Sequence, residues 1–244
     1  AQSQPLPVKI GLNHESSADC IWTGEYYYLR GTYLDGYWPD ANQYALPLTL
    51  YDENGNKIKT YRSNTQKDKQ LNISLINNII GDKNGHLYLR THQSFIKFDM
   101  QTETFTTIIK NNVSAIYQGK NQTWLCVGDT IYQYHPGTSP TLTRTAILDN
   151  PHNQIYYNIF EDSDQNCWIC TNKGLYLLDR NNNIHHYIPE YSIKHIFQDT
   201  QNYLWVSTLG KGLLKLNRSG QILKNYRKGQ SAHTLISDSV RCVC

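Results

Sequence analysis

Short apolar runs separated by polar turns dominate the pattern of the chain. The clearest unit covers residues 196–217, where the apolar run 204–206 follows a turn marked by Asp199. A glycine loop at 210–212 then leads into a further apolar run at 213–216. Apolar runs without polar alternation are typical of strands covered on both faces, and Asp and Gly mark tight turns. The pattern therefore predicts short buried strands joined by turns.

The same unit recurs along the chain. In each copy an aromatic residue follows a polar turn residue by six positions. The aromatic residues of the four copies are Tyr88, Trp124, Trp168 and Trp205. They recur roughly every 40 residues, and a period of that length with four short strands per unit is typical of a β-propeller blade. We expect these four side chains to be buried at equivalent positions between blades.

The sequence predicts an all-β fold, a β-propeller of about five four-stranded antiparallel blades with an incomplete final blade. The blades are expected at residues 16–63, 71–110, 111–149, 150–189 and 190–229. The first of them matches the repeat least and holds an aromatic insertion at 35–44. Residues 235–244 resemble the strand that opens the other blades, so we expect them to start a further blade. The chain is then a fragment of a larger propeller array.

Composition narrows the range of partners. The hydrophobic fraction is 39%, and 19 Tyr and 5 Trp supply the aromatic bulk that suits pleated sheets. A net charge of +3 is too small to favour a nucleic-acid partner, so none is expected for this region. No apolar run approaches the ~18 residues of a membrane-spanning helix.

The cysteine pattern does not indicate a metal or redox site. Cys167 and Cys170 form a C-x-x-C motif, but they flank Trp168-Ile169 in an expected strand. Alternation along a strand turns the two thiols to opposite faces. We therefore interpret both as small apolar strand residues, and predict no metal and no cofactor. Disulfides in an oxidising compartment stay open, with no pairing derived.

The repeat around Trp168 carries a family resemblance. Residues 161–175 read Glu-Asp-Ser-Asp-Gln-Asn-Cys-Trp-Ile-Cys-Thr-Asn-Lys-Gly-Leu. This run resembles the two-component regulator propeller repeat, approximately Asp-x-x-Gly-x-Leu-Trp-Ile-Gly-Thr and then Gly-Leu. The repeat around Trp205 fits as well, whereas one copy has Tyr88 in place of Trp and the copy at 111–149 lacks the Asp and the Thr. The resemblance covers about residues 71–244.

The resemblance implies a location and a function. Arrays of this kind form the periplasmic sensor half of hybrid two-component regulators, common in gut Bacteroidetes. It implies a carbohydrate-binding sensor in signal transduction, the extracytoplasmic part of an inner-membrane protein. The implied ligand is an oligosaccharide, and the implied partners are the remaining blades and domains, including a histidine kinase, of the full-length sensor. A homodimer is left open. This fragment itself is not expected to be an enzyme.

The candidate ligand site combines the aromatic insertion with loops of later blades. Aromatic rings stack on the apolar face of a pyranose, and amides and carboxylates bond its hydroxyl groups. All candidates follow a second strand and precede a third, so a propeller presents them on one face. They are Tyr37, Trp38, Asp40, Asn42, Tyr44, His92, Asn172 and Lys173. The alternative is that Trp38 and Tyr44 fold back as a cover for the first blade.

Catalytic residues are not predicted. The chain has no G-x-S-x-G elbow, P-loop, HExxH or dinucleotide fingerprint. Its recurrent carboxylates occupy turn positions, where Asp caps the turn with its own side chain. They are Asp52, Asp99, Asp162, Asp179 and Asp199. Two other function classes stay open: a propeller polysaccharide lyase or glycosidase, which needs convergent acid–base groups, and a protein–protein interaction scaffold.

Overall fold

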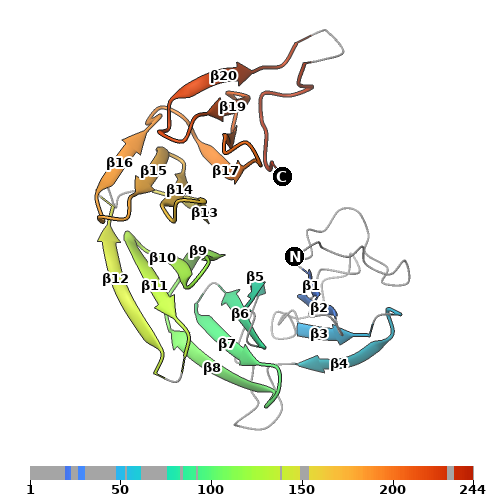
Figure 1. The fold of residues 1–244 in the computed structure, drawn as a ribbon. Coiled ribbons are helices and arrows are strands. Elements are labelled where there is room, and N and C mark those ends of the chain that lie inside the picture. The colour runs from blue at the N-terminus through green and yellow to red at the C-terminus, as the bar shows by residue number, and fades with distance from the viewer. Residues whose placement is uncertain are drawn as a thin grey trace. The chain divides into compact units, whose positions relative to one another are not determined.

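The computed structural model describes residues 20–22, 27–30, 48–52, 54–61, 76–82, 85–91, 93–137, 139–148, 154–229 and 234–243. Within these ranges the chain forms twenty strands and no helix. The strands make five antiparallel sheets of four strands each, and consecutive strands are neighbours in every sheet (Figure 1). The chain divides into two units, Ala1–Val113 and Ser114–Cys244, which are described separately.

The first unit holds two sheets. The first sheet consists of β1 (Cys20–Trp22), β2 (Tyr27–Arg30), β3 (Leu48–Tyr51) and β4 (Lys57–Tyr61). The second consists of β5 (Ile76–Gly81), β6 (His86–Thr91), β7 (Phe95–Asp99) and β8 (Thr104–Ile109). Apolar side chains of β3, β5, β6 and β7 form one buried cluster, in which the Tyr61 ring meets Phe98 edge-on at 5.0 Å.

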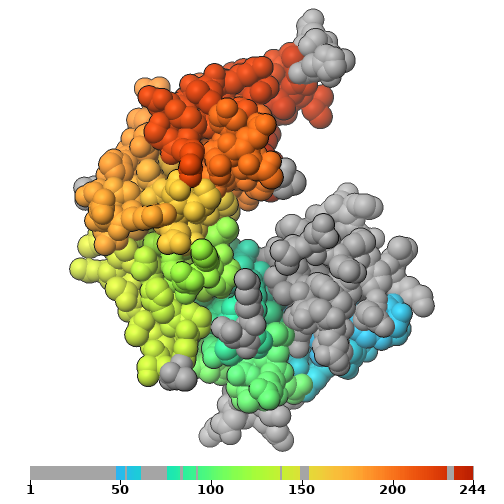
Figure 2. All heavy atoms as spheres, viewed as in Figure 1, coloured from blue at the N-terminus to red at the C-terminus, as the bar shows by residue number. Residues whose placement is uncertain are grey.

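The second unit holds three sheets. The first contains β9 (Val113–Gln118), β10 (Thr123–Val127), β11 (Thr130–His135) and β12 (Thr141–Ile147). The next contains β13 (Tyr156–Glu161), β14 (Cys167–Thr171), β15 (Gly174–Leu178) and β16 (Ile184–Tyr187). The last contains β17 (Ile193–Gln198), β18 (Leu204–Thr208), β19 (Leu213–Leu216) and β20 (Ile222–Tyr226). The side chains of these three sheets pack into one continuous body (Figure 2).

Burial within the second unit follows the order of the strands. All five residues of β10, of β14 and of β15 are buried, whereas the fourth strands β12, β16 and β20 are mostly exposed. A strand covered on both faces has no reason to alternate apolar and polar residues. The middle strands are therefore continuous apolar runs, as the sequence pattern predicted.

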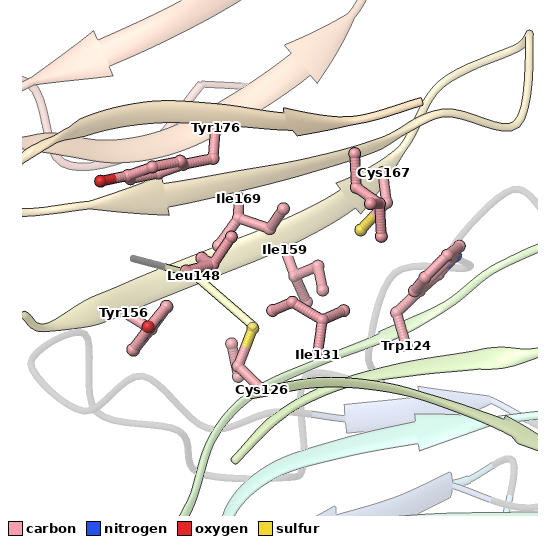
Figure 3. Close-up of a cluster of buried hydrophobic side chains, with 11 residues drawn as sticks. Trp124, Cys126, Ile131, Leu148, Tyr156, Ile159, Cys167, Ile169 and Tyr176 are labelled. Atoms are coloured by element: carbon pink, nitrogen blue, oxygen red, sulfur yellow. The ribbon is translucent and has the colours of Figure 1, made fainter. Parts of the chain in front are cut away.

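Two apolar clusters lie between the sheets of the second unit. In one, Trp124, Cys126 and Ile131 meet Cys167 and Ile169 of the next sheet (Figure 3). In the other, side chains on the opposite face of β14 meet the last sheet; its members include Trp168, Cys170, Ile196, Val206 and Leu214. The C-x-x-C thiols thus face opposite sides of the strand, as predicted. Burial raises the pKa of both thiols well above its ordinary value.

Three of the four repeated aromatic residues are each bonded to a carboxylate of the preceding turn. Asp162 Oδ1 accepts two backbone N–H groups of its own turn, each at 2.9 Å. Its second oxygen, Oδ2, accepts the indole N–H of Trp168 at 2.9 Å. The equivalent pairs are Asp199 with Trp205 at 2.8 Å and Asp82 with the Tyr88 hydroxyl at 2.9 Å. One carboxylate therefore fixes both the turn and the buried ring of the following strand.

The copy that lacks this Asp uses a residue from the next sheet. The indole N–H of Trp124 donates to Glu161 Oε2 at 2.7 Å, and Glu161 lies at the end of β13. Glu161 also accepts from Lys120 N at 2.8 Å and Gln122 Nε2 at 2.7 Å. A Cβ on Gly119 would lie 2.5 Å from Glu161 Oε2, so only glycine leaves room for the carboxylate there. The buried Glu161 thus joins two neighbouring sheets.

One expectation about burial needs correction. Tyr88, Trp124 and Trp168 are buried, but Trp205 is only half-buried. The ring of Trp168 is covered by the following sheet, and the described residues contain no four-stranded sheet after that of Trp205. Residues 235–243 form no strand, because no described strand is there to pair with them. Instead Val240 N donates to Thr208 O at 2.9 Å. Their assignment to a further blade stays a prediction.

The two tryptophans should differ in their contribution to stability. Trp168→Ala removes a fully buried indole and should lower the free energy of unfolding by ~3–5 kcal/mol. Trp205→Ala removes a half-buried ring and should cost about 1–2 kcal/mol. Denaturant unfolding of both variants beside the wild type measures this difference. An unfolding midpoint of Trp168→Ala equal to that of the wild type would show that the indole is not part of the core.

Candidate functional site

The first strand of several sheets contains a β-bulge near its start. The pairing register with the second strand shifts in β5, β13 and β17. The extra residues are Asn77, Tyr157 and Lys194. A bulge takes one residue out of the hydrogen-bond ladder and re-aims its side chain, and bulges are common next to binding sites. The backbone feature recurs, but each sheet presents a different side chain through it.

Two of these residues meet in the second unit. The Lys194 ammonium lies 3.3 Å from the centroid of the Tyr157 ring. Their strands, β13 and β17, are the adjacent first strands of neighbouring sheets (Figure 1). A cation over an aromatic face is stabilised by about 0.5–2 kcal/mol. Among the described residues no carboxylate lies within ion-pair distance of Lys194.

Polar atoms without partners gather near the same strands. The carboxamide of Gln154, the Tyr156 hydroxyl, Ser192 Oγ and His195 Nδ1 are buried and have no hydrogen-bond partner among the described residues. Native proteins contain few such atoms, because each one costs desolvation energy. These four residues precede or occupy the first half of β13 and β17. The beginning of each of these two first strands therefore offers hydrogen-bonding groups that no described residue uses.

His195 is the titratable group of this region whose ordinary pKa lies nearest neutrality. It lies directly after Lys194 on β17 and is half-buried. Burial lowers the pKa of its imidazole below the ordinary value of 6.5, while a hydrogen bond to the backbone of Val243 acts in the opposite direction. The ring is therefore neutral at pH 7, and its Nδ1 can donate or accept a proton according to its tautomer.

The recurrent carboxylates act in turns, as expected. Each accepts backbone N–H groups from residues two to four positions further on. In Asp179 the side-chain and backbone hydrogen bonds of Asn183 lower the carboxyl pKa to about 2. A carboxylate held this way stays ionised and does not serve as an acid or a base near neutral pH.

The structure places two of the eight predicted site residues. Asn172 and Lys173 lie in the turn between β14 and β15. Asn172 Oδ1 accepts from Ile155 N at 2.7 Å, and Asn172 N donates to Ile155 O at 3.0 Å. The Lys173 carbonyl lies 2.7 Å from His186 Nε2. Outside the described residues lie the other six: Tyr37, Trp38, Asp40, Asn42, Tyr44 and His92. The predicted site therefore stays a prediction.

The bulge residues were missed in the sequence, although a signal for them exists. The buried apolar residues of β17 are Ile193 and Ile196, three positions apart, and those of β13 are Tyr156 and Ile159. A regular strand places residues of one face two positions apart. An apolar spacing of three that recurs at the start of the repeat thus predicts an extra residue between them.

The residues that the structure describes lack two further features. No group of three or more His, Cys, Asp or Glu side chains there is placed to hold a metal ion. No helix there has the length and apolar character needed to cross a membrane.

Four-stranded antiparallel sheets whose first strands lie side by side define the blades of a β-propeller. Residues 150–173 match the family model described as the two-component regulator propeller. The chain thus carries a two-component regulator propeller repeat, and this repeat includes β13 and β14. No curated protein is significantly similar to the chain in sequence.

Solved structures of low sequence identity share the fold. PorZ, a surface component of the type-IX secretion system of Porphyromonas gingivalis, superposes with a TM-score of 0.65 at 14% identity over 91% of this chain. The extracellular domain of BT4673 from B. thetaiotaomicron, a proposed one component system, gives 0.60 at 16% identity over 98%. Virginiamycin B lyase from Staphylococcus aureus gives 0.61 at 13% identity over 84%. These likenesses show the propeller fold and span both extracellular domains and lyases.

The chain is shorter than these proteins. It covers 35% of the PorZ chain, 38% of the BT4673 domain and 67% of the lyase.

The lowered pKa of His195 predicts a pH-dependent stability. The unfolded state binds a proton near pH 6.5, above the folded-state pKa, so the contribution of neutral His195 is complete above that pH and is lost as the pH falls through the folded pKa. His195→Gln should therefore reduce the loss of melting temperature between about pH 7.5 and about pH 5.5. His185→Gln, at an exposed position, is the control. Equal pH dependence in His195→Gln and the wild type would contradict the burial of the imidazole.

Proposed function

We propose that the chain is the ligand-sensing part of an extracytoplasmic propeller sensor of the hybrid two-component type. The observation that carries this proposal is the two-component regulator propeller repeat at residues 150–173, because that repeat names the class of protein. The likeness of the fold to an extracellular domain from B. thetaiotaomicron supports a periplasmic location. The histidine kinase then lies elsewhere in the full-length sensor.

An oligosaccharide is the proposed ligand. The loops between the second and third strands differ from blade to blade and carry polar side chains, as a recognition surface requires. The proposed site joins the aromatic insertion to these loops and consists of Tyr37, Trp38, Asp40, Asn42, Tyr44, His92, Asn172 and Lys173. Stacking on Trp38 supplies apolar contact, and Asp40 and Asn42 orient hydroxyl groups.

Sensing requires more than binding. A ligand changes the signalling state only if its affinity differs between two conformations of the sensor. The remaining blades and domains of the full-length protein are the proposed partners that convert this difference into a signal. A second copy of the chain is the alternative partner. The ligand-bound blades would then favour one arrangement of these partners.

A propeller lyase is the second candidate function. The observation in its favour is that the fold resembles virginiamycin B lyase as closely as it resembles the BT4673 domain, with TM-scores of 0.61 and 0.60. Such an enzyme needs an acid–base group that reaches the substrate. Asp162 and Asp199, the best placed recurrent carboxylates, are bonded to their turns and to the indoles. The sensor proposal requires no such group.

Oligosaccharide titration tests the sensor proposal. Wild-type chain should bind a member of a glycan panel, and tryptophan fluorescence should report the affinity. Trp38→Ala should weaken binding by tenfold or more, since a stacked ring contributes about 1–3 kcal/mol. Trp205→Phe is the matched control, because it replaces a tryptophan that is bonded to a turn carboxylate and is not part of the proposed site. This variant should bind the glycan with the affinity of the wild type.

Two outcomes would contradict the proposal. Equal affinity in Trp38→Ala and the wild type would remove the insertion from the site. Turnover of the bound glycan into an unsaturated product, followed by ultraviolet absorbance, would replace the sensor by the lyase.

A further inference from the structure

The bulge residues Tyr157 and Lys194 are called the bulge pair. In this pair the Tyr157 ring holds the Lys194 ammonium in place without neutralising its charge. The ring fixes the Lys194 Nζ atom at 3.3 Å from its centroid. An aromatic face attracts a cation through its quadrupole, but it carries no net charge. A lysine has three N–H donors, and the ring contacts only one side of the ammonium. The other side remains able to bind an anion.

Acidic side chains of the second unit are engaged elsewhere. Glu161 binds the Trp124 indole, Asp164 pairs with Arg218, and Asp238 lies 3.2 Å from Arg227. The turn carboxylates cap their own turns. Asp129 accepts from the Thr130 hydroxyl, and neither it nor Glu190 forms an ion pair with Lys194, so no described acid of this unit lies within ion-pair distance of the ammonium.

Neutral polar groups flank the bulge pair. His195 follows Lys194, and Asn158 follows Tyr157 at the equivalent place in the next sheet. His195 Nδ1 and the nearby Ser192 Oγ are buried without a hydrogen-bond partner among the residues that the structure describes. A polar guest that bonded to them would relieve the cost of their desolvation. The region thus offers one positive charge and several neutral hydrogen-bonding groups.

We propose that Tyr157, Lys194 and His195 form a subsite for the carboxylate of an acidic saccharide. One ammonium matches the single negative charge of a uronic acid, with Asn158 and Ser192 supplying hydrogen bonds to the carboxylate or to adjacent hydroxyls. A phosphate monoester carries close to two charges at neutral pH and is usually bound by several cations or by Arg. The saccharide part of this assignment rests on the proposed function. The site lies on the first strands β13 and β17 and uses no residue of the aromatic insertion.

A structural role for the same contact predicts a different result. Lys215 of the third strand β19 lies over the Tyr203 ring at 3.7 Å, so it makes the same kind of contact away from the bulges of the first strands. If Lys194 acted only as a link between blades, replacing it would change stability and leave anion binding unaltered. Lys215→Met is therefore the matched control for Lys194→Met.

Amide chemical shifts of the whole chain give a direct test. Sodium glucuronate should shift the amide resonances of Tyr157, Lys194 and His195 in a saturable titration, whereas glucose should not. Lys194→Met should weaken the glucuronate affinity about tenfold or more, as expected for the loss of a charge-assisted hydrogen bond. Lys215→Met should keep the wild-type affinity, and thermal unfolding of both variants confirms that they are folded.

Three results would overturn the subsite. They are no saturable glucuronate shifts in this region, equal affinity in Lys194→Met and the wild type, and tighter binding of glucose 6-sulfate than of glucuronate. Binding of a neutral oligosaccharide that depends on Trp38 and not on Lys194 would leave the sensor function standing while the acid subsite failed. Lys194-dependent glucuronate binding, with no oligosaccharide of the panel bound by the wild type, would leave the acid subsite standing while the oligosaccharide-sensor proposal failed.

Discussion

A carboxylate bonded to an aromatic side chain of the second strand is the interaction on which four of the five described sheets depend. In the pair Asp162 and Trp168 one oxygen of the carboxylate holds the turn and the other holds the indole. A buried indole N–H without a partner costs about 1–3 kcal/mol, so the ring can be buried only if an acceptor is buried with it. The bond therefore couples the hairpin turn to the core between two sheets. In Asp162 and Asp199 this coupling engages both oxygens of the carboxylate.

We propose that ligand recognition uses the positions that take no part in the carboxylate–aromatic bonds. The described second strands β6, β10, β14 and β18 are mostly buried, and Tyr88, Trp124 and Trp168 pack in the core. The bulges of the inner strands and the loops after the second strands carry residues that differ between blades, such as Tyr157 and Lys194. A repeated backbone with unequal side chains can recognise one ligand among many, because the scaffold stays fixed while the contacts vary. The proposed sensor function and the acid subsite both use this division.

The sequence was sufficient for the fold because the period of the repeat reports the blade directly. The sequence was insufficient to predict a hydrogen-bond partner that comes from another repeat. Trp124 lacks an Asp six positions before it, and its acceptor Glu161 lies 37 residues later in the next sheet. The exposure of Trp205 likewise depends on whether a further sheet covers its ring, not on its own motif. A bulge is visible in the sequence as a spacing of three positions between the buried residues Ile193 and Ile196. Only the strand pairing shows which residue between them is the extra one.

Hydrogen exchange of the indole N–H groups tests this account most directly. Trp124 and Trp168 should exchange far more slowly than a free indole, because each is buried and bonded to a carboxylate. Glu161→Ala should accelerate exchange at Trp124 and leave Trp168 protected by its own Asp162. Unchanged protection of Trp124 in Glu161→Ala, or exchange of both indoles at the rate of a free indole in the wild type, would contradict the carboxylate–aromatic bond as the basis of the blades.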